Sequence, residues 1–391
     1  MLPPAICVGL LLVVRCLGVL SDFSNWTAVS EVRGWVDITT GNEGSLLAAV
    51  VNQGFIYLSF DSGLTWNQRG DARAWTAIAT SANGSLLAAV ATNDFIYISS
   101  DNGTSWLPTA YAKNWQSVAV SLTGEVIAAC AYTDVVYIST DRGVSWAGRG
   151  GSAPIVAMSG DGSIIFAAQS PGNIYVTYNY GSVWTATGAP SKQWRSLAVS
   201  VDGIHLAAAE AINGYIWLSS DTGSSWRQSA APLAAWVGIS CSYDGSHIAA
   251  STFNGNIHIS SNFGASWTST APTLAWGPTA ISLCGGHVAA VVYAGSVYTS
   301  SIDSVPLTCN PYSFTSPPGP PASSLSSNLG PSFTTTDLIV VLVICSVFFC
   351  AFWTFLCCTC QCADRRSNTE LIESFNQKPD LSNDIFLRDV D

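Results

Sequence analysis

Short sequence markers recur about every 40 residues through most of the chain, and this period constrains the fold more than any other feature. Pairs of alanines begin at Ala48, Ala88, Ala128, Ala167, Ala207, Ala249 and Ala289. A tryptophan opens six of the seven units, at Trp35, Trp75, Trp115, Trp194, Trp236 and Trp276, and Ile155 takes its place in the fourth. Two independent markers in one register indicate seven copies of a single structural unit.

A turn motif is the third marker. Residues 99–106 read Ser-Ser-Asp-Asn-Gly-Thr-Ser-Trp and follow an apolar run at 95–98. An Asp or Asn side-chain oxygen can accept hydrogen bonds from the following backbone, and glycine permits the positive φ that a tight turn needs. The tryptophan then buries its ring as the next strand begins. The acceptor position is occupied by Asp61, Asp101, Asp141, Asn179, Asp221 and Asn262, and residues 301–303 form a degenerate copy.

Each unit holds several short strands. In the second unit, apolar runs predict strands at 75–81, 86–91 and 95–99, and a fourth strand begins at Trp106. Four strands in a repeat of this length are typical of one blade of a β-propeller. We therefore predict an all-β, seven-bladed β-propeller. The second-strand alanines would let neighbouring blades approach closely.

The two ends of the repeat region predict how the ring closes. Trp26 keeps the 40-residue register but follows no complete unit, whereas residues 296–300 form a third strand without a fourth. We expect residues 26–29 to complete the last blade, which would leave only short, protected edges. The fourth unit departs from the others at 148–155 and 179–180, which indicates either drift or a local binding loop.

The turn motif resembles the Asp-box, or BNR repeat, of the sialidase and sortilin superfamily. This resemblance is at the level of the fold and implies a structural role for the box, away from the substrate face. Sialidases have six blades, an Arg cluster and an Arg-Ile-Pro motif, whereas sortilin-type sorting receptors have ten blades and a Cys-rich module. These family features are missing from the sequence.

Beyond the repeats, the composition changes twice. We predict a signal peptide at 1–20, with an uncleaved anchor as the alternative, and the propeller at 21–308. A Pro/Ser/Thr-rich stalk follows at 309–336, then a transmembrane helix at 337–358 and a cytoplasmic tail at 359–391. Residues 338–356 carry no charge, and Arg365 and Arg366 follow them, so a type I orientation is expected.

Cysteines and sequons add modification sites. Cys357, Cys358, Cys360 and Cys362 are palmitoylation candidates, and zinc is the rival interpretation of this cluster. Sequons at Asn25, Asn83 and Asn102 predict N-glycosylation. The pairing of Cys130, Cys241, Cys284 and Cys309 stays open: a pair between Cys241 and Cys284 is conceivable, and Cys130 reads as a buried free thiol. Residues 370–372 faintly resemble a dileucine sorting signal.

The composition favours binding over catalysis. The formal net charge of −11 argues against a nucleic-acid partner. Scattered acids and four histidines, without triad or metal spacing, indicate no catalytic residues, no metal and no cofactor. We expect a single-pass type I membrane glycoprotein that binds an unknown protein or glycan at a cell surface, on an endomembrane or in a viral envelope. A sortilin-like sorting receptor and a sialidase-like glycosidase are the alternatives.

Overall fold

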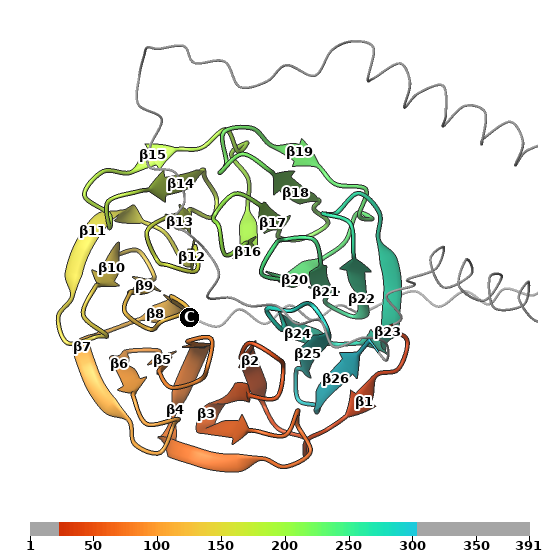
Figure 1. Cartoon of the computed structure of the whole chain (residues 1–391), viewed down its shortest axis with the longest axis horizontal. Helices are drawn as coiled ribbons and strands as arrows, with labels where there is room; N and C mark the ends of the chain where they lie inside the picture. The colour runs from red at the N-terminus through yellow and green to blue at the C-terminus, as the bar shows by residue number, and fades with distance from the viewer. Residues whose placement is uncertain (1–22, 303–391) are drawn as a thin grey trace, which may run out of the picture. The chain divides into compact units, whose positions relative to one another are not determined.

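The structure is a computed structural model that describes residues 23–302, and in this part of the chain the regular structure consists of strands alone. The strands form sheets that stand around a common centre (Figure 1). In most sheets, strands that follow one another in sequence pair antiparallel and step outward from the centre. This arrangement is a β-propeller, as the repeats predict.

Six sheets make up the ring. The first in sequence holds β2 (Trp35–Thr40), β3 (Leu47–Ser59), β4 (Asn67–Thr80), β5 (Leu87–Ala91), β6 (Asp94–Ser99) and β7 (Leu107–Lys113). The second holds β8 (Trp115–Val120), β9 (Ile127–Ala131), β10 (Val135–Ser139) and β11 (Ala147–Ser152). The third holds β12 (Ile155–Met158), β13 (Ile165–Ala168), β14 (Ile174–Thr177) and β15 (Thr185–Ala186).

The remaining sheets follow the same plan. The fourth holds β16 (Trp194–Val199), β17 (Leu206–Glu210), β18 (Ile216–Ser219) and β19 (Arg227–Gln228). The fifth holds β20 (Trp236–Cys241), β21 (Ile248–Thr252), β22 (Gly255–Ser260) and β23 (Thr268–Leu274). The last holds β24 (Trp276–Ile281), β25 (His287–Val292), β26 (Val297–Ser301) and β1 (Thr27–Ala28).

The prediction of seven blades is wrong, because the seven sequence repeats are distributed over six sheets. The strand β4 is 14 residues long and serves two repeats. Its first part pairs with β3 up to the partners Asn52 and Ala74, and its second part pairs with β5 from Trp75 onward. The strand continues through residues 70–74, with a positive φ at Gly70 and with Arg73 and Ala74 still paired with β3, so the first and second repeats fuse into one six-stranded sheet.

The predicted closure by the N-terminal strand is confirmed. β1 pairs antiparallel with β26, with Thr27 opposite Thr299 and Ala28 opposite Tyr298. The backbone N–H of Val29 continues the pairing to the carbonyl oxygen of Val297 at 2.8 Å. The last sheet therefore takes its outermost strand from the start of the described chain, and the ring closes without a long unpaired edge.

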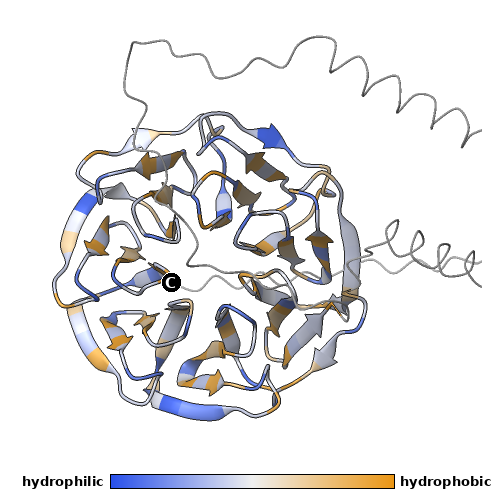
Figure 2. Ribbon diagram, viewed as in Figure 1, coloured by the Kyte–Doolittle hydropathy of each residue, from blue (hydrophilic) through white to orange (hydrophobic). Residues whose placement is uncertain are grey.

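The core lies between the sheets. The alanines of the second strands are almost entirely buried, and so are all six opening tryptophans. Figure 2 shows hydrophobic residues along the middle strands of each sheet, whereas parts of the outer strands β4, β11 and β19 are hydrophilic. Small alanines let adjacent sheets approach, and the tryptophans fill the space between the sheets. The 40-residue sequence period therefore reflects the packing of one repeat against the next.

The predicted membrane span lies outside the described residues. Among residues 23–302, no helix is long and apolar enough to cross a membrane. The predicted signal peptide, stalk and cytoplasmic tail, with Cys357, Cys358, Cys360 and Cys362, also fall outside this range. They stay predictions from the sequence.

Candidate functional site

The six repeat turns are built as the sequence predicts, and their side chains are occupied within the turn. In the second repeat, the Ser99 hydroxyl donates to Asp101 Oδ1 at 2.8 Å and accepts from the Gly103 N–H at 2.8 Å. Asp101 Oδ1 also accepts from the Ser105 N–H at 2.9 Å. The same three bonds recur at Asp61, Asp141, Asn179, Asp221 and Asn262. Asn can replace Asp because the recurring bond needs only the Oδ1 acceptor.

These hydrogen bonds shift the acidity of the exposed carboxyl groups. Bonds from Ser105 and Ser99 lower the pKa of Asp101 to about 2. Bonds from Thr65 likewise lower the pKa of Asp61. A carboxylate that is held ionised by its own turn is well suited to fix the backbone and poorly suited to exchange protons near neutral pH.

A second set of turns joins the first and second strands of each repeat, and the sequence reasoning missed the hydrogen-bonded motif that these turns share. The Ser81 hydroxyl donates to Asn83 Oδ1 at 3.1 Å and accepts from the Leu86 N–H at 3.0 Å. Ser159 and Asp161, like Ser242 and Asp244, repeat this arrangement. The signal was a Ser three residues before a glycine, which occurs in every repeat except the first, where Gly41 takes the place of the Ser. We call the side of the ring that carries both sets of turns the turn face.

Backbone hydrogen bonds between these second turns form a closed circuit. The successive donor and acceptor residues are Asn42 to Ala82, Ala82 to Leu122, Leu122 to Gly160, Gly160 to Val201, Val201 to Tyr243, Tyr243 to Leu283, and Cys284 to Asn42. Six of the seven distances are 2.7 to 2.9 Å, and the bond from Cys284 to Asn42 is 3.4 Å. Each repeat is therefore tied to the next around the centre of the ring.

A central channel of about 600 Å³ runs between the inner strands. In most repeats the residue after the opening tryptophan forms a β-bulge, because the pairing with the second strand skips it. The bulge turns the side chain of this residue away from the paired strands. The channel-lining residues at this position are Val36, Thr76, Gln116, Arg195 and Val237. These residues differ in charge, size and polarity although the tryptophan before them repeats. The channel wall therefore varies within an otherwise uniform scaffold.

Asp37 is the titratable residue of the channel whose acidity changes most. Its Oδ2 accepts a hydrogen bond from the Ile78 N–H of the next repeat at 2.9 Å. Burial raises the pKa of this carboxyl to about 7, although backbone bonds from Ile78 and Ile38 and the charge of Arg195 oppose the rise. Ser117 and Ser196 make the corresponding inter-repeat bonds with neutral hydroxyls. A carboxyl group is therefore the more costly choice at this position.

Arg195 is exposed in the channel wall and forms no ion pair with another residue in the range 23–302. Its charge and a hydrogen bond act on Tyr293, whose pKa is raised by burial and lowered in part by Arg195. Asp37, Arg195 and Tyr293 come from the first, fifth and seventh repeats. The ring thus brings together one cation, one carboxyl and one phenol that lie far apart in sequence.

Four other cations of the ring are neutralised locally. Arg33, Arg73, Lys113 and Lys192 each lie two residues before an opening tryptophan and sit over an aromatic ring at 4.3 to 5.5 Å from its centroid. Each also pairs with a carboxylate, at Glu31, Asp94, Asp134 and Glu210 respectively. The sequence reasoning missed this repeated packing device. Arg195 differs from these four cations because it forms no ion pair within residues 23–302, although its charge acts on Asp37 and Tyr293.

Aromatic side chains lie on the side of the ring opposite the turn face, and one of them, Tyr132, lines the channel. Tyr132 is 61 % exposed and Phe253 is 50 % exposed, and both lie where the second strand of a repeat ends. Phe253 lies 6.3 Å from Tyr293 between ring centroids. We call Tyr132, Arg195, Phe253 and Tyr293 the channel mouth. It combines exposed aromatic surface with a guanidinium that has no ion-pair partner among the described residues, which is typical chemistry of a binding site.

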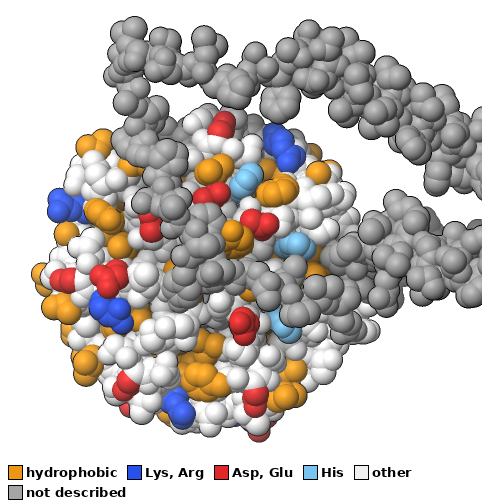
Figure 3. Space-filling model, in the orientation of Figure 1, with side chains coloured by type: hydrophobic (Ala, Val, Ile, Leu, Met, Phe, Trp, Pro, Cys, Tyr) orange, Lys and Arg blue, Asp and Glu red, His pale blue; other side chains and the backbone are white. Residues whose placement is uncertain are grey.

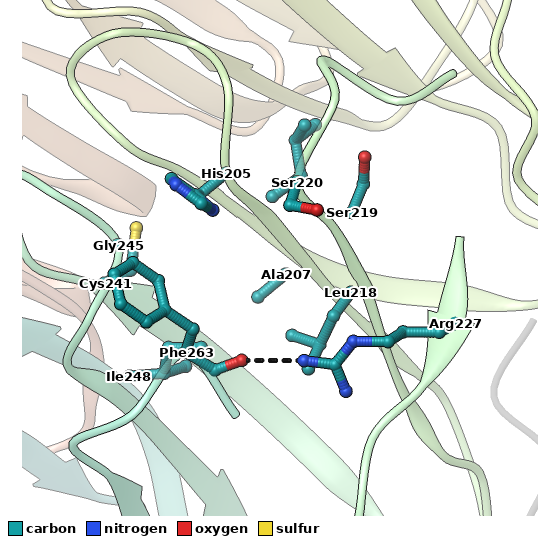
Figure 4. A pocket seen from close by; sticks show the side chains of 11 residues that line it. His205, Ala207, Leu218, Ser219, Ser220, Arg227, Cys241, Gly245, Ile248 and Phe263 are labelled. Carbon is teal, nitrogen blue, oxygen red and sulfur yellow. Dashed lines mark hydrogen bonds between the residues drawn. The ribbon is translucent and has the colours of Figure 1, made fainter. Parts of the chain in front are cut away.

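The turn face carries a smaller cavity. About 250 Å³ lies between the fifth and sixth repeats, beside His205, Cys241 and Phe263 (Figure 4). Arg227 points across this cavity and donates to the carbonyl oxygen of Phe263 at 3.1 Å. On the face shown in Figure 3, acidic and histidine side chains are scattered among neutral and hydrophobic ones, so that view shows no large patch of one charge.

The remaining predicted sites are placed as follows. Asn25, Asn83 and Asn102 are all exposed, so their side chains are accessible, and glycosylation stays a prediction. Cys130 is a buried free thiol, as expected, and Cys241 is also free, so the conceivable pair of Cys241 with Cys284 is wrong. Cys284 is disulfide-bonded, and its partner is none of the other cysteines within residues 23–302. The described residues contain no group of three or more metal-ligating side chains.

Comparison with known proteins identifies the architecture. No family model and no curated protein matches the sequence. YCF48 from Cyanidioschyzon merolae superposes with a TM-score of 0.58 at 14 % identity, over 72 % of this chain and 99 % of that one. The Cps50 (Swd1) propeller domain of Myceliophteria thermophila gives 0.60 at 12 % identity, over 71 % and 99 %.

An enzyme is also among the structural neighbours. The GH74 xyloglucanase from Xanthomonas campestris superposes with a TM-score of 0.56 at 15 % identity, over 72 % of this chain and 54 % of that one. At such identities the similarity concerns the fold alone. The chain is a β-propeller, similar in architecture to proteins of different function.

Proposed function

We propose that this protein is a non-catalytic binding propeller that engages its ligand at the channel mouth. The observation that carries the proposal is Arg195, a cation in a concave, polar channel that lacks a carboxylate partner among the described residues. An arginine of this kind can form paired hydrogen bonds with an anionic or carbonyl-rich ligand.

The aromatic rim supplies the second part of the proposed site. Tyr132 exposes a large ring at the channel, and Phe253 exposes another next to Tyr293, the partner of Arg195. Residues of this type, together with arginine, contribute most of the affinity in many interfaces. A rigid scaffold that holds such side chains loses little conformational entropy on binding. We therefore favour a protein segment as the ligand, with a glycan as the other class.

A structural neighbour supports this choice. YCF48 has been solved bound to the D1 peptide, and that complex superposes on this chain with a TM-score of 0.57 at 13 % identity, over 71 % of this chain and 97 % of that one. A propeller of similar architecture therefore binds a peptide. The identity is too low to carry over the partner or the contacting residues.

The proposed setting is a single-pass type I membrane glycoprotein, at a cell surface, on an endomembrane or in a viral envelope. It rests on the uncharged segment at 338–356, the following Arg365 and Arg366, and the exposed sequon residues. A sortilin-like sorting receptor is a special case of this setting, in which the tail would also carry a sorting signal.

A glycosidase is the second candidate, because a xyloglucanase shares the architecture. Glycoside hydrolysis usually uses a pair of carboxyl groups across the scissile bond. Asp37 is the one carboxyl side chain among the residues that line the channel, and Asp-box resemblance says nothing about catalysis. We therefore rank binding above hydrolysis.

The test compares the two faces. Labelled full-length protein in detergent micelles or nanodiscs would be titrated onto intact cells, with saturable binding as the measurement. Arg195→Glu and Tyr132→Ala should each weaken binding at least about tenfold, a loss of about 1.4 kcal/mol. Val144→Ser and Arg227→Gln, which change exposed residues of a repeat turn and of the outer strand β19, should bind like the wild type. Loss of binding only in the latter two variants would exclude the channel mouth.

A further inference from the structure

One side chain of each repeat packs against a glycine of the next repeat, in the turn that joins its first and second strands. The pairs are Leu46 with Gly84, Leu86 with Gly124, Val126 with Gly162, Ile164 with Gly203, His205 with Gly245, His247 with Gly285, and His287 with Gly44. A Cβ atom on any of these glycines would meet the neighbouring side chain at 2.2 to 3.1 Å. These seven contacts, which we call seams, join the repeats on the turn face.

Four seams are apolar and three contain histidine. Leu46, Leu86, Val126 and Ile164 are buried, with exposed fractions of 8 % or less. His205, His247 and His287 are partly buried and occupy three consecutive seams, from the fifth repeat around to the first. The last of these lies at the closure, where the C-terminal repeat meets the first. The four apolar seams therefore serve as an internal control for the three seams that contain histidine.

Two of the histidine seams lie beside cavities. His205 lines the 250 Å³ cavity shown in Figure 4, with its ring 4.8 Å from that of Phe263. His287 lines a cavity of about 300 Å³ together with Gly44 and Asn25. Water could reach a protonated imidazole from these cavities, so the histidine seams have room to open.

Burial favours the neutral imidazole at two of these histidines, His247 and His287. Burial lowers the pKa of His247, against a smaller opposing effect of Asp244, and burial also lowers the pKa of His287. The Ser246 hydroxyl lies 3.0 Å from His247 Nδ1.

Few other charges face these rings. Asp202 and Asp244 lie in the turns beside His205, and Arg227 and Cys241 line its cavity. Cys284, in the turn against His247, is disulfide-bonded and does not titrate. Glu43 lies in the turn that holds Gly44, and Ser62, beside Asp61 of the first repeat turn, lines the cavity at His287.

We propose that His247 and His287 make one side of the ring acid-sensitive: their protonation loosens the two seams that they form with Gly285 and Gly44, while the four apolar seams stay closed. This inference goes beyond the proposed function, because it would hold for any ligand. The sign follows from linkage. A histidine whose folded-state pKa lies below its unfolded value contributes full stability above about pH 6.5 and loses it as the pH falls.

One backbone hydrogen bond of the closed circuit crosses each seam, so the protection of its N–H group measures the opening of that seam alone. The N–H groups of Val201, Tyr243 and Cys284 cross the histidine seams, whereas those of Asn42, Ala82, Leu122 and Gly160 cross the apolar seams. Amide hydrogen exchange of the full-length protein, followed by mass spectrometry at residue resolution, would be compared between about pH 7.5 and about pH 5.5 after correction for intrinsic rates.

We expect the amides of Tyr243 and Cys284, which cross the seams of His247 and His287, to lose protection severalfold at the lower pH, and the four apolar-seam amides to keep it. The triple variant His205→Leu, His247→Leu, His287→Leu restores the residue type of the apolar seams and should remove this difference. The single variant His247→Leu should restore protection at the lower pH only at the Tyr243 amide. This variant tests the proposal if the triple variant does not fold.

His258→Tyr is the matched control. His258 packs against Trp236 inside a repeat, its pKa is also lowered by burial, and Tyr is the residue at this position in other repeats, as at Tyr97. This variant should keep the selective loss of protection. Equal loss at all seven amides, no loss at any, or an unchanged pattern in His247→Leu would each overturn the proposal.

Discussion

At the scale of single residues, the repeat turn depends on its first hydroxyl as much as on its acid. Ser99 is 1 % exposed and is the acceptor for the Gly103 N–H, whereas the carboxylate of Asp101 is exposed. The buried group has no access to water as a substitute partner. The sequence motif draws attention to Asp and Gly, but burial gives the serine the larger energetic role.

Ser99→Ala should therefore destabilise the protein by about 1–3 kcal/mol, because it leaves a buried N–H without an acceptor. Thermal unfolding followed by circular dichroism measures the loss. Ser105→Ala, at an exposed position of the same turn, is the control and should change stability far less. Equal effects of the two variants would contradict this explanation.

Asp37 predicts a pH dependence of the opposite kind to that of the histidines. Its pKa is raised to about 7 in the folded protein, so its ionisation opposes folding increasingly as the pH rises from about 4 through 7. Asp37→Asn keeps an acceptor for the Ile78 N–H and removes the charge. We expect it to stabilise the protein by about 2 kcal/mol at about pH 8, with the full shift reduced by channel water, and to have little effect near pH 4.

The measurement is the melting temperature of both proteins across that pH range. A variant that is less stable than the wild type at high pH would show that Asp37 stabilises the fold as a carboxylate. The predicted result would mean that a destabilising acid is present in the channel, as is common at binding sites.

At the scale of elements, the short strand β1 and the residues beside it contact both the last sheet and the first. Besides the pairing with β26, the Val29 carbonyl oxygen accepts from Trp66 Nε1 at 2.8 Å, and the Ser30 hydroxyl accepts from the Val297 N–H at 2.7 Å. Trp26 packs against Trp276 with ring centroids 5.8 Å apart. This segment thus joins the last sheet to the first.

Deleting residues 25–30 should expose the edge of β26 and remove the Trp26 contact. Truncation of a buried tryptophan alone costs about 3–5 kcal/mol, and Trp26 is only partly buried, so the lower end applies to its ring. We expect a lower melting temperature and aggregation during secretion.

A six-residue deletion at 317–322, in the predicted stalk, is the control and should leave both properties unchanged. If the N-terminal deletion melted and was secreted like the wild type, closure by β1 would contribute nothing to stability.

At the scale of the whole molecule, the predicted type I orientation places the propeller and its sequons on one side of a membrane. Protease added to intact cells should leave only the tail side protected, as detected with an epitope tag after residue 391. Protection of the propeller instead would reverse the orientation.

Glycosylation gives an independent test of the predicted orientation, because the propeller must face the lumen or the outside of the cell to be glycosylated. Asn25, Asn83 and Asn102 are exposed, so we expect N-glycosidase to increase the gel mobility of the protein from its native source. Replacing all three with Gln should abolish the shift. A wild-type protein whose mobility does not change would contradict the prediction.

The sequence by itself determined the repeats, the strand order within them, the hydrogen-bonded turns at residues such as Asp101, and the closure by residues 26–29. These features are local, or follow from a strict period, so hydrophobic pattern and turn chemistry suffice to predict them. The period also suggested seven separate blades, which the tertiary structure corrected.

Only the tertiary structure decided what depends on contacts between repeats. β4 continues past residue 70 because both of its parts find pairing partners, which the period could not reveal. Asp37, Arg195 and Tyr293 meet only because the ring closes. The three histidines looked unrelated in sequence, and their shared place in the seams depends on packing between neighbours about 40 residues apart. Such long-range packing is set by the folded backbone, not by local propensity.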